Sequence, residues 1–230
     1  MSEIKTIKDV LGHLGGFKEE FDRNPDMLRR LSQELEKIPR GNVWKGINEV
    51  RILFSLYEAL KAEGITGKQV LDIGCGSRVS TSYDVAEPWL ARILQAYGAN
   101  VVGLDIRDSP DENYEHIQSD LTRNILDHIV EGRHFDFVIA KDFFTSPTLL
   151  NDPNSTLSDY NTRQLEEFFR DISMQVFNIL NTGGIYIPEF VGIKEEEILR
   201  GVGFRVEPSR YSRGTEPTIL ARKPEYIKME

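Results

Sequence analysis

The sequence predicts an α/β fold in which a mostly parallel sheet carries helices on both faces. From residue 70 onward, short apolar segments alternate with helical patterns, as in parallel sheets. The first apolar segment is Val70-Leu71-Asp72-Ile73, and Gly74-Cys75-Gly76 follows it directly. The two glycines let the backbone turn toward a ligand. Acids lie at or just beyond the carboxyl ends of four successive predicted strands, and these acids are Asp72, Asp105, Asp120 and Asp142.

The strands of the predicted sheet are expected at residues 70–73, 101–105, 114–118, 135–140, 185–187, 204–207 and 218–222. Pro88 begins a predicted helix over 89–97, and further helices are expected over 162–180 and 194–200. Because glycine favours the carboxyl ends of helices, Asn181-Thr182-Gly183-Gly184 is predicted to be the turn that stops the longest of them.

The first part of the chain, residues 1–66, is predicted to be a helical extension to an α/β domain over residues 67–230. Asn24-Pro25-Asp26 has the residues of a helix start, and a second helix is expected over about 44–63. The extension either covers a substrate cavity or mediates dimerisation, or it packs on the sheet to complete the core. The sequence favours neither interpretation over the other.

Composition limits the classes of function. The chain has 230 residues, 40% of them hydrophobic and 28% charged, with no apolar segment near the roughly 20 residues that span a bilayer. One cysteine excludes an internal disulfide, and four scattered histidines form no metal-binding motif, so no metal site is predicted. The formal net charge of -9 argues against nucleic acid as the main partner. The N-terminal residues lack a signal-peptide pattern, so a cytoplasmic protein without membrane association is expected.

The motifs at the strand ends resemble, in order, those of the class I S-adenosylmethionine-dependent methyltransferases. The resemblance extends over about residues 66–223. It implies a Rossmann-like, seven-stranded methyltransferase sheet. The segments that carry it are Val70 to Gly76, Val102-Gly103-Leu104-Asp105, Ile117-Gln118-Ser119-Asp120-Leu121, Phe135-Asp136-Phe137-Val138-Ile139, Leu180-Asn181-Thr182-Gly183-Gly184 and Gly201-Val202-Gly203-Phe204.

The resemblance implies S-adenosylmethionine as the cofactor and a role for each residue at the site. Asp72 would hold the amino-acid end of the cofactor, and the backbone of Gly74, Cys75 and Gly76 would lie against it. Asp105 would accept hydrogen bonds from both ribose hydroxyls. Asp120 would receive the adenine amino group, Ile106 and Leu121 would flank the ring, and Lys141 with Asp142 would face the point where the methyl group leaves.

Two departures from the family pattern lie after the glycine turn. Arg78 takes the place where the family often has a third glycine, and the interval to Asp105 is longer than usual. The extra residues, 77–87, form either a lid or an insertion without a chemical role. A nicotinamide cofactor would require a third glycine where Val79 stands and an acid about 20 residues after the turn, so S-adenosylmethionine is favoured.

Methyl transfer from a sulfonium depends chiefly on positioning, and a base is needed only if the acceptor must lose a proton. The catalytic candidates are Asp142, Lys141 and Tyr83. Family members that methylate amino groups of nucleic-acid bases have an Asn/Asp-Pro-Pro-aromatic signature where this chain has Lys141-Asp142-Phe143-Phe144.

The sequence therefore predicts a methyltransferase that acts on a small-molecule acceptor. The alternative is a non-catalytic S-adenosylmethionine-binding or interaction protein on the same fold. A homodimer is compatible with both interpretations.

Overall fold

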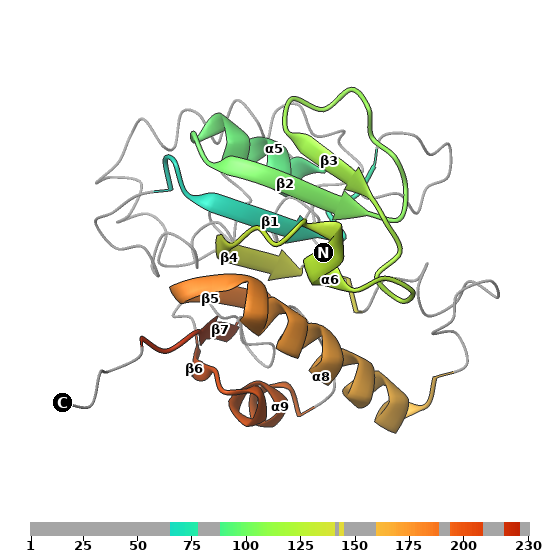
Figure 1. Cartoon of the computed structure of the whole chain (residues 1–230), viewed down its shortest axis with the longest axis vertical. Helices are drawn as coiled ribbons and strands as arrows, with labels where there is room; N and C mark the ends of the chain where they lie inside the picture. Colours follow the sequence, from blue (N-terminus) through green and yellow to red (C-terminus); the bar gives the residue numbers. More distant parts are fainter. Residues whose placement is uncertain are drawn as a thin grey trace, which may run out of the picture.

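The computed structural model describes residues 65–77, 88–140, 143–144, 160–188, 194–208 and 219–225 (Figure 1). The predicted N-terminal helices, most of the 77–87 loop, and the candidates Tyr83, Lys141 and Asp142 lie outside the described residues. The division at residue 66 therefore stays a prediction.

The described strands form one seven-stranded sheet in the order β3-β2-β1-β4-β5-β7-β6. β7 is antiparallel to β5 and to β6, whereas β1 to β5 pair in parallel. The strands are β1 (Gln69–Ile73), β2 (Asn100–Asp105), β3 (Glu115–Gln118), β4 (Phe135–Ala140), β5 (Leu180–Pro188), β6 (Arg205–Pro208) and β7 (Ile219–Arg222).

The order of the strands reverses between β1 and β4. The chain winds from β1 through β2 to β3 on one side, and it then returns to place β4 on the other side of β1. In the register of the sheet, Asp72 lies beside Gly103 of β2 and Ile139 of β4. Ligands of open parallel sheets bind at the carboxyl ends of the strands beside such a reversal.

Helices cover both faces of the sheet. Figure 1 shows α6 (Leu126–Ile129) and α8 (Thr162–Ile179) on one face, with α9 (Glu195–Val202) beside α8. On the other face α5 (Trp89–Ala96) packs on β2. No helix of the described residues is long and apolar enough to cross a membrane.

The core follows from the alternation of side chains along the strands. Leu71 and Ile73 of β1 are fully buried in one cluster with residues of α8 such as Phe169 and Val176. Val70 and Asp72, which alternate with them, belong to the opposite face and are also buried. Burial on both faces explains why β1, β2 and β4 read as nearly continuous apolar segments. The edge strand β3 is neither apolar nor buried.

The sequence prediction of the strands is confirmed to within one or two residues at each end for six of them. β4 has the predicted bounds of residues 135–140. The predicted helices correspond to α5, α8 and α9, with ends that differ by at most two residues. The four-residue α6 was missed, because one helical turn is too short to establish a period.

The helix predicted to stop before residues 181–184 does end there, but these residues do not form a separate turn before the fifth strand. α8 ends at Ile179, and β5 begins at the next residue and contains all four positions. The pairing of β4 with β5 shifts register there: Phe135 faces Leu180, but Phe137 faces Ile185. Gly183, with φ of 77°, donates its N–H to the Lys223 carbonyl, so contacts with other parts of the sheet hold the segment in place.

Candidate functional site

The glycine turn after β1 lies against the carboxyl end of β2. The Gly74 N–H donates to the Leu104 carbonyl at 2.7 Å, and the Cys75 N–H donates to the same oxygen at 3.3 Å. Gly74 and Gly76 have φ of 70° and 94°, values that side chains rarely allow. The two glycines are therefore required by the backbone conformation of the turn.

Asp105, the last residue of β2, is hydrogen-bonded to this turn. Its Oδ2 accepts the N–H of Gly76 at 3.0 Å, and its Oδ1 accepts the N–H of Arg107 at 3.0 Å. A carboxylate oxygen can accept two hydrogen bonds. The carboxylate of Asp105 is therefore fixed in orientation by the backbone and keeps acceptor capacity on both oxygens.

Asp72 is the penultimate residue of β1 and is 2% exposed. Its negative charge, together with that of Asp105, adds to burial in raising the pKa of the Cys75 thiol. Burial likewise raises the pKa of Tyr114 above its ordinary value, with Cys75, Glu112 and Asp72 as further causes. Asp72 and Asp105 thus act electrostatically on the same small region behind the glycine turn.

His116 of β3 links this region to the connection that follows β2. Its Nε2 lies 2.8 Å from the Arg107 carbonyl oxygen, which can only accept a hydrogen bond. Nε2 therefore donates, and a neutral ring leaves Nδ1 as the acceptor, 3.7 Å from the Cys75 sulfur. His116 thus makes structural contacts between β3, the glycine turn and the connection after β2.

Gly103 of β2 makes room for two of these side chains. A Cβ at Gly103 would lie 2.6 Å from Cε2 of Tyr114 and 2.9 Å from the Cys75 sulfur, closer than such atoms approach. Sequence reasoning did not assign Gly103 or Tyr114 a place behind the site. The available signal was a glycine inside an otherwise apolar strand, which indicates close packing of another group.

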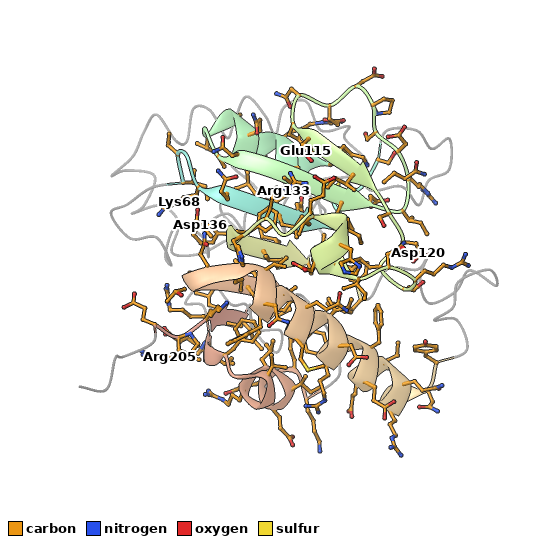
Figure 2. The ribbon with its side chains drawn as sticks, viewed as in Figure 1. Lys68, Glu115, Asp120, Arg133, Asp136 and Arg205 are labelled. Carbon is orange, nitrogen blue, oxygen red and sulfur yellow. The ribbon has the colours of Figure 1, made fainter. Side chains whose placement is uncertain are left out.

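Asp120 lies at the same edge of the sheet, one strand farther out (Figure 2). Its Oδ1 accepts two hydrogen bonds from Thr122, at 2.9 Å from the backbone and 2.7 Å from the hydroxyl, while Oδ2 faces Nε of Arg123 at 3.2 Å. Asp120 therefore stabilises the turn after β3. Only Oδ2 keeps room for a further donor.

The two apolar residues assigned to the adenine ring differ in exposure. Ile106, next to Asp105, is 46% exposed. Leu121 is 5% exposed and belongs to the hydrophobic core. Ile106 thus presents apolar surface beside the Asp105 carboxylate, whereas the side chain of Leu121 mainly packs inward.

The structure brings the residues at the ends of β1 and β2 into one group and places Asp120 beside it. Lys68 and Asp136 lie at the opposite edge of the sheet, near the starts of the strands (Figure 2). Within the described residues, no group of three or more His, Cys, Asp or Glu side chains could hold a metal ion.

Comparison with known proteins gives partial matches, and no family model matches the chain. A ubiquinone biosynthesis O-methyltransferase of Pasteurella multocida is 33% identical over 87 residues, covering 34% of this chain and 31% of the relative. The protein of the same name in Shewanella pealeana is 38% identical over 72 residues, covering 31% of this chain and 26% of the relative. The matches thus span less than a third of either relative's length.

Among solved structures, a 16S rRNA methyltransferase of T. thermophilus, in complex with AdoMet and guanosine, matches with a TM-score of 0.50. The sequences are 19% identical, and the match covers 77% of this chain and 43% of that chain. At this identity the likeness establishes a common fold.

Proposed function

We propose that this chain, which has the fold of the class I S-adenosylmethionine-dependent methyltransferases, transfers a methyl group from S-adenosylmethionine to a small-molecule acceptor. The observation that carries the proposal is the hydrogen bond from Gly76 to Asp105. It joins the glycine turn after β1 to the carboxylate at the end of β2, beside the point where the strand order reverses.

The groups around this hydrogen bond fit the cofactor. Asp105 uses one acceptor position of each oxygen for a backbone N–H, so both oxygens have room for a ribose hydroxyl. Gly76, whose N–H is bonded to Asp105, has no side chain, so the backbone beside that carboxylate allows close approach. The exposed side chain of Ile106 offers an apolar surface to the adenine ring next to that carboxylate.

The remaining cofactor assignments belong to the same proposal. Asp72 holds the amino-acid end, with the backbone of Cys75 beside it. Asp120 receives the adenine amino group through Oδ2, since Oδ1 already accepts two hydrogen bonds from Thr122. Leu121 and Lys141 are the remaining proposed cofactor-binding residues.

S-adenosylmethionine supplies an already activated methyl group, so the chain contributes mainly by orientation, an effect worth up to roughly 7–11 kcal/mol in well-positioned systems. Where the acceptor must lose a proton, Asp142, Lys141 and Tyr83 are the proposed candidates for a base.

Two features support a small molecule as the acceptor. The chain carries a formal net charge of -9, which opposes binding to a phosphate backbone. Residues 141–144 also lack the signature of family members that methylate bases. The partial relatives are named for ubiquinone biosynthesis, whereas the T. thermophilus neighbour is an rRNA methyltransferase. Both acceptor classes therefore belong in the test.

Asp105→Ala tests the cofactor site. Calorimetric titration of the wild type with S-adenosylmethionine and with S-adenosylhomocysteine should give binding. Asp105→Ala should weaken both by at least about tenfold, because hydrogen bonds to a charged acceptor are worth about 1.5–3 kcal/mol each. Asp111→Ala is the matched control, since it removes an exposed acid from the same connection between β2 and β3 and should leave affinity unchanged.

Thermal melting distinguishes lost contacts from lost folding. If the melting temperature of Asp105→Ala is much lower than that of the wild type, the titration is repeated with Asp105→Asn. The amide has nearly the same shape as the carboxylate but no charge. Unchanged affinity in a folded variant would contradict the ribose assignment. Absence of binding to the wild type would contradict the whole proposal.

A transfer assay then tests catalysis and acceptor class. The wild type is incubated with methyl-labelled S-adenosylmethionine and, separately, with a small-metabolite pool, tRNA and a protein fraction. Label in the metabolite pool is expected. Label only in tRNA or protein would contradict the acceptor class, and intact binding without any transfer would identify a non-catalytic binding protein.

A further inference from the structure

Phe143, three residues after the end of β4, lies against the glycine turn of β1. A Cβ placed on Gly74 would be 3.2 Å from both Cβ and Cδ2 of Phe143. The contact follows from the sheet, because β1 and β4 are parallel neighbours and their carboxyl ends therefore meet. Sequence reasoning gave Phe143 no role in cofactor binding.

The ring of Phe143 is the half-buried end of a row of aromatic side chains. It contacts the ring of Phe144 edge-on, with centroids 4.9 Å apart, and the ring of Phe168 at 6.3 Å. Phe144 in turn packs edge-on against Phe169, and both of these are buried in the core. The row supports Phe143 from the side of the core, and the side chain of Phe143 is half-buried.

The covalent structure of S-adenosylmethionine brings the positive charge of its sulfonium close to Gly74 and Phe143. The sulfur is bonded to the ribose, assigned above to Asp105, and to the methionine chain, assigned to Asp72. Gly74 lies between Asp72 and Gly76, the residue that is hydrogen-bonded to Asp105. A cofactor held at both ends therefore brings its positively charged sulfur close to Gly74.

We infer that Phe143 is a cofactor-contacting residue whose ring faces the sulfonium and favours the charged substrate over the neutral product. An aromatic face attracts a cation through its quadrupole and has no such attraction for the uncharged thioether of S-adenosylhomocysteine. The ring thereby contributes to the release of product after transfer. This inference rests on the proposed function of the same site.

The affinity ratio between the two ligands tests it. In Phe143→Leu and Phe143→Met, calorimetry should show S-adenosylmethionine binding weakened by about fivefold and S-adenosylhomocysteine binding changed by less than about twofold. Phe143→Tyr keeps an aromatic face and should keep the wild-type ratio. Phe177→Leu is the matched control, since it removes a half-buried ring of α8 that packs on Phe204 and not on Phe143, and it should leave the ratio unchanged.

The ratio of the two affinities distinguishes a contact between Phe143 and the sulfonium from a role of Phe143 in packing alone. An equal loss of affinity for both ligands in the two aliphatic variants, or no change in either, would overturn the inference. Failure of the wild type to bind either ligand would instead overturn the proposed function. Using two aliphatic variants keeps the comparison available if one of them does not fold.

Discussion

Cys75 is the single cysteine of the chain, and it occupies the middle of the glycine turn. Its side chain is buried between β1, Gly103 of β2 and His116 of β3. Burial and the charges of Asp72 and Asp105 raise the pKa of the thiol well above its ordinary value of 9.0. The thiol is therefore protonated in the folded protein at neutral pH and in moderately alkaline solution.

This pKa shift predicts a pH dependence of stability. Above pH 9 the thiol ionises in the unfolded chain but keeps its proton in the folded one, so stability falls as the pH rises. Between pH 8 and pH 10 the free energy of unfolding of the wild type should fall by roughly 1 kcal/mol more than that of Cys75→Ala. Urea denaturation of both proteins at the two pH values measures the difference.

Tyr114 and Tyr186 also have pKa values raised by burial, and they destabilise the fold in alkaline solution in the same direction. They are present in both proteins, so their effect largely cancels in the comparison. Parallel pH profiles for wild type and Cys75→Ala would contradict the burial of an un-ionised thiol.

At the scale of elements, α8 has the most complete set of local signals. Its N-cap, Asn161, accepts the N–H of Gln164 at 3.1 Å, and the Gln164 side chain accepts the N–H of Asn161 at 3.0 Å. This capping box satisfies two backbone donors at the start of the helix. Because the signal is contained within four residues, the start of α8 was predictable from the sequence.

Removing the cap should destabilise the protein. We expect Asn161→Ala to lower the free energy of unfolding by about 1 kcal/mol, with a range of roughly 0.5–2 kcal/mol, because the Gln164 N–H loses its acceptor. Arg163→Ala, which breaks an exposed ion pair with Glu167 on the same helix, should change it by less than about 0.5 kcal/mol. Urea unfolding followed by circular dichroism measures both, and equal effects would contradict the capping role.

At the carboxyl end of α8, in contrast, contacts with distant residues determine the structure. The glycines at 183 and 184 have the local appearance of a helix stop, yet residues 180–188 form one strand. Asn181 donates to Oδ1 of Asp136 at 3.1 Å, and Gly183 donates to Lys223. These partners are at least forty residues away along the chain, so no local pattern could reveal them.

At the scale of the whole molecule, one buried ion pair ties α5 to the connection between β2 and β3. Arg92 donates through Nε at 2.8 Å and through a terminal nitrogen at 2.6 Å to the two carboxylate oxygens of Glu112. The side chains are 12% and 3% exposed. The pair joins a helix on one face of the sheet to the connection that directly follows Asp105 and contains Arg107.

Breaking one half of this pair should cost more than replacing both halves. Arg92→Met or Glu112→Leu alone should lower the free energy of unfolding by about 3–5 kcal/mol, because each removes the opposite charge from a buried ionised side chain. The double variant should lose distinctly less than the sum of the single losses. A double-mutant cycle by urea denaturation measures the coupling, and additive single effects would contradict it.

The sequence by itself determined the positions of six of the seven described strands, of α5, α8 and α9, and of the glycine turn. Each of these depends on the period of apolar residues or on turn and cap residues within a few positions. β4, predicted and found at residues 135–140, is the clearest example. The sequence also indicated Asp105 as a site residue, since acids at the ends of parallel strands meet at one edge.

Only the tertiary structure decided how these pieces meet. It placed Phe143 against Gly74, made Asp120 the centre of a turn, and filled the space beside Gly103 with Tyr114 and Cys75. Each contact depends on which strands become neighbours and on which face a side chain lies. Strand neighbours and the faces on which side chains lie are decided by burial of the whole core. They cannot be predicted from the sequence around any one of these residues.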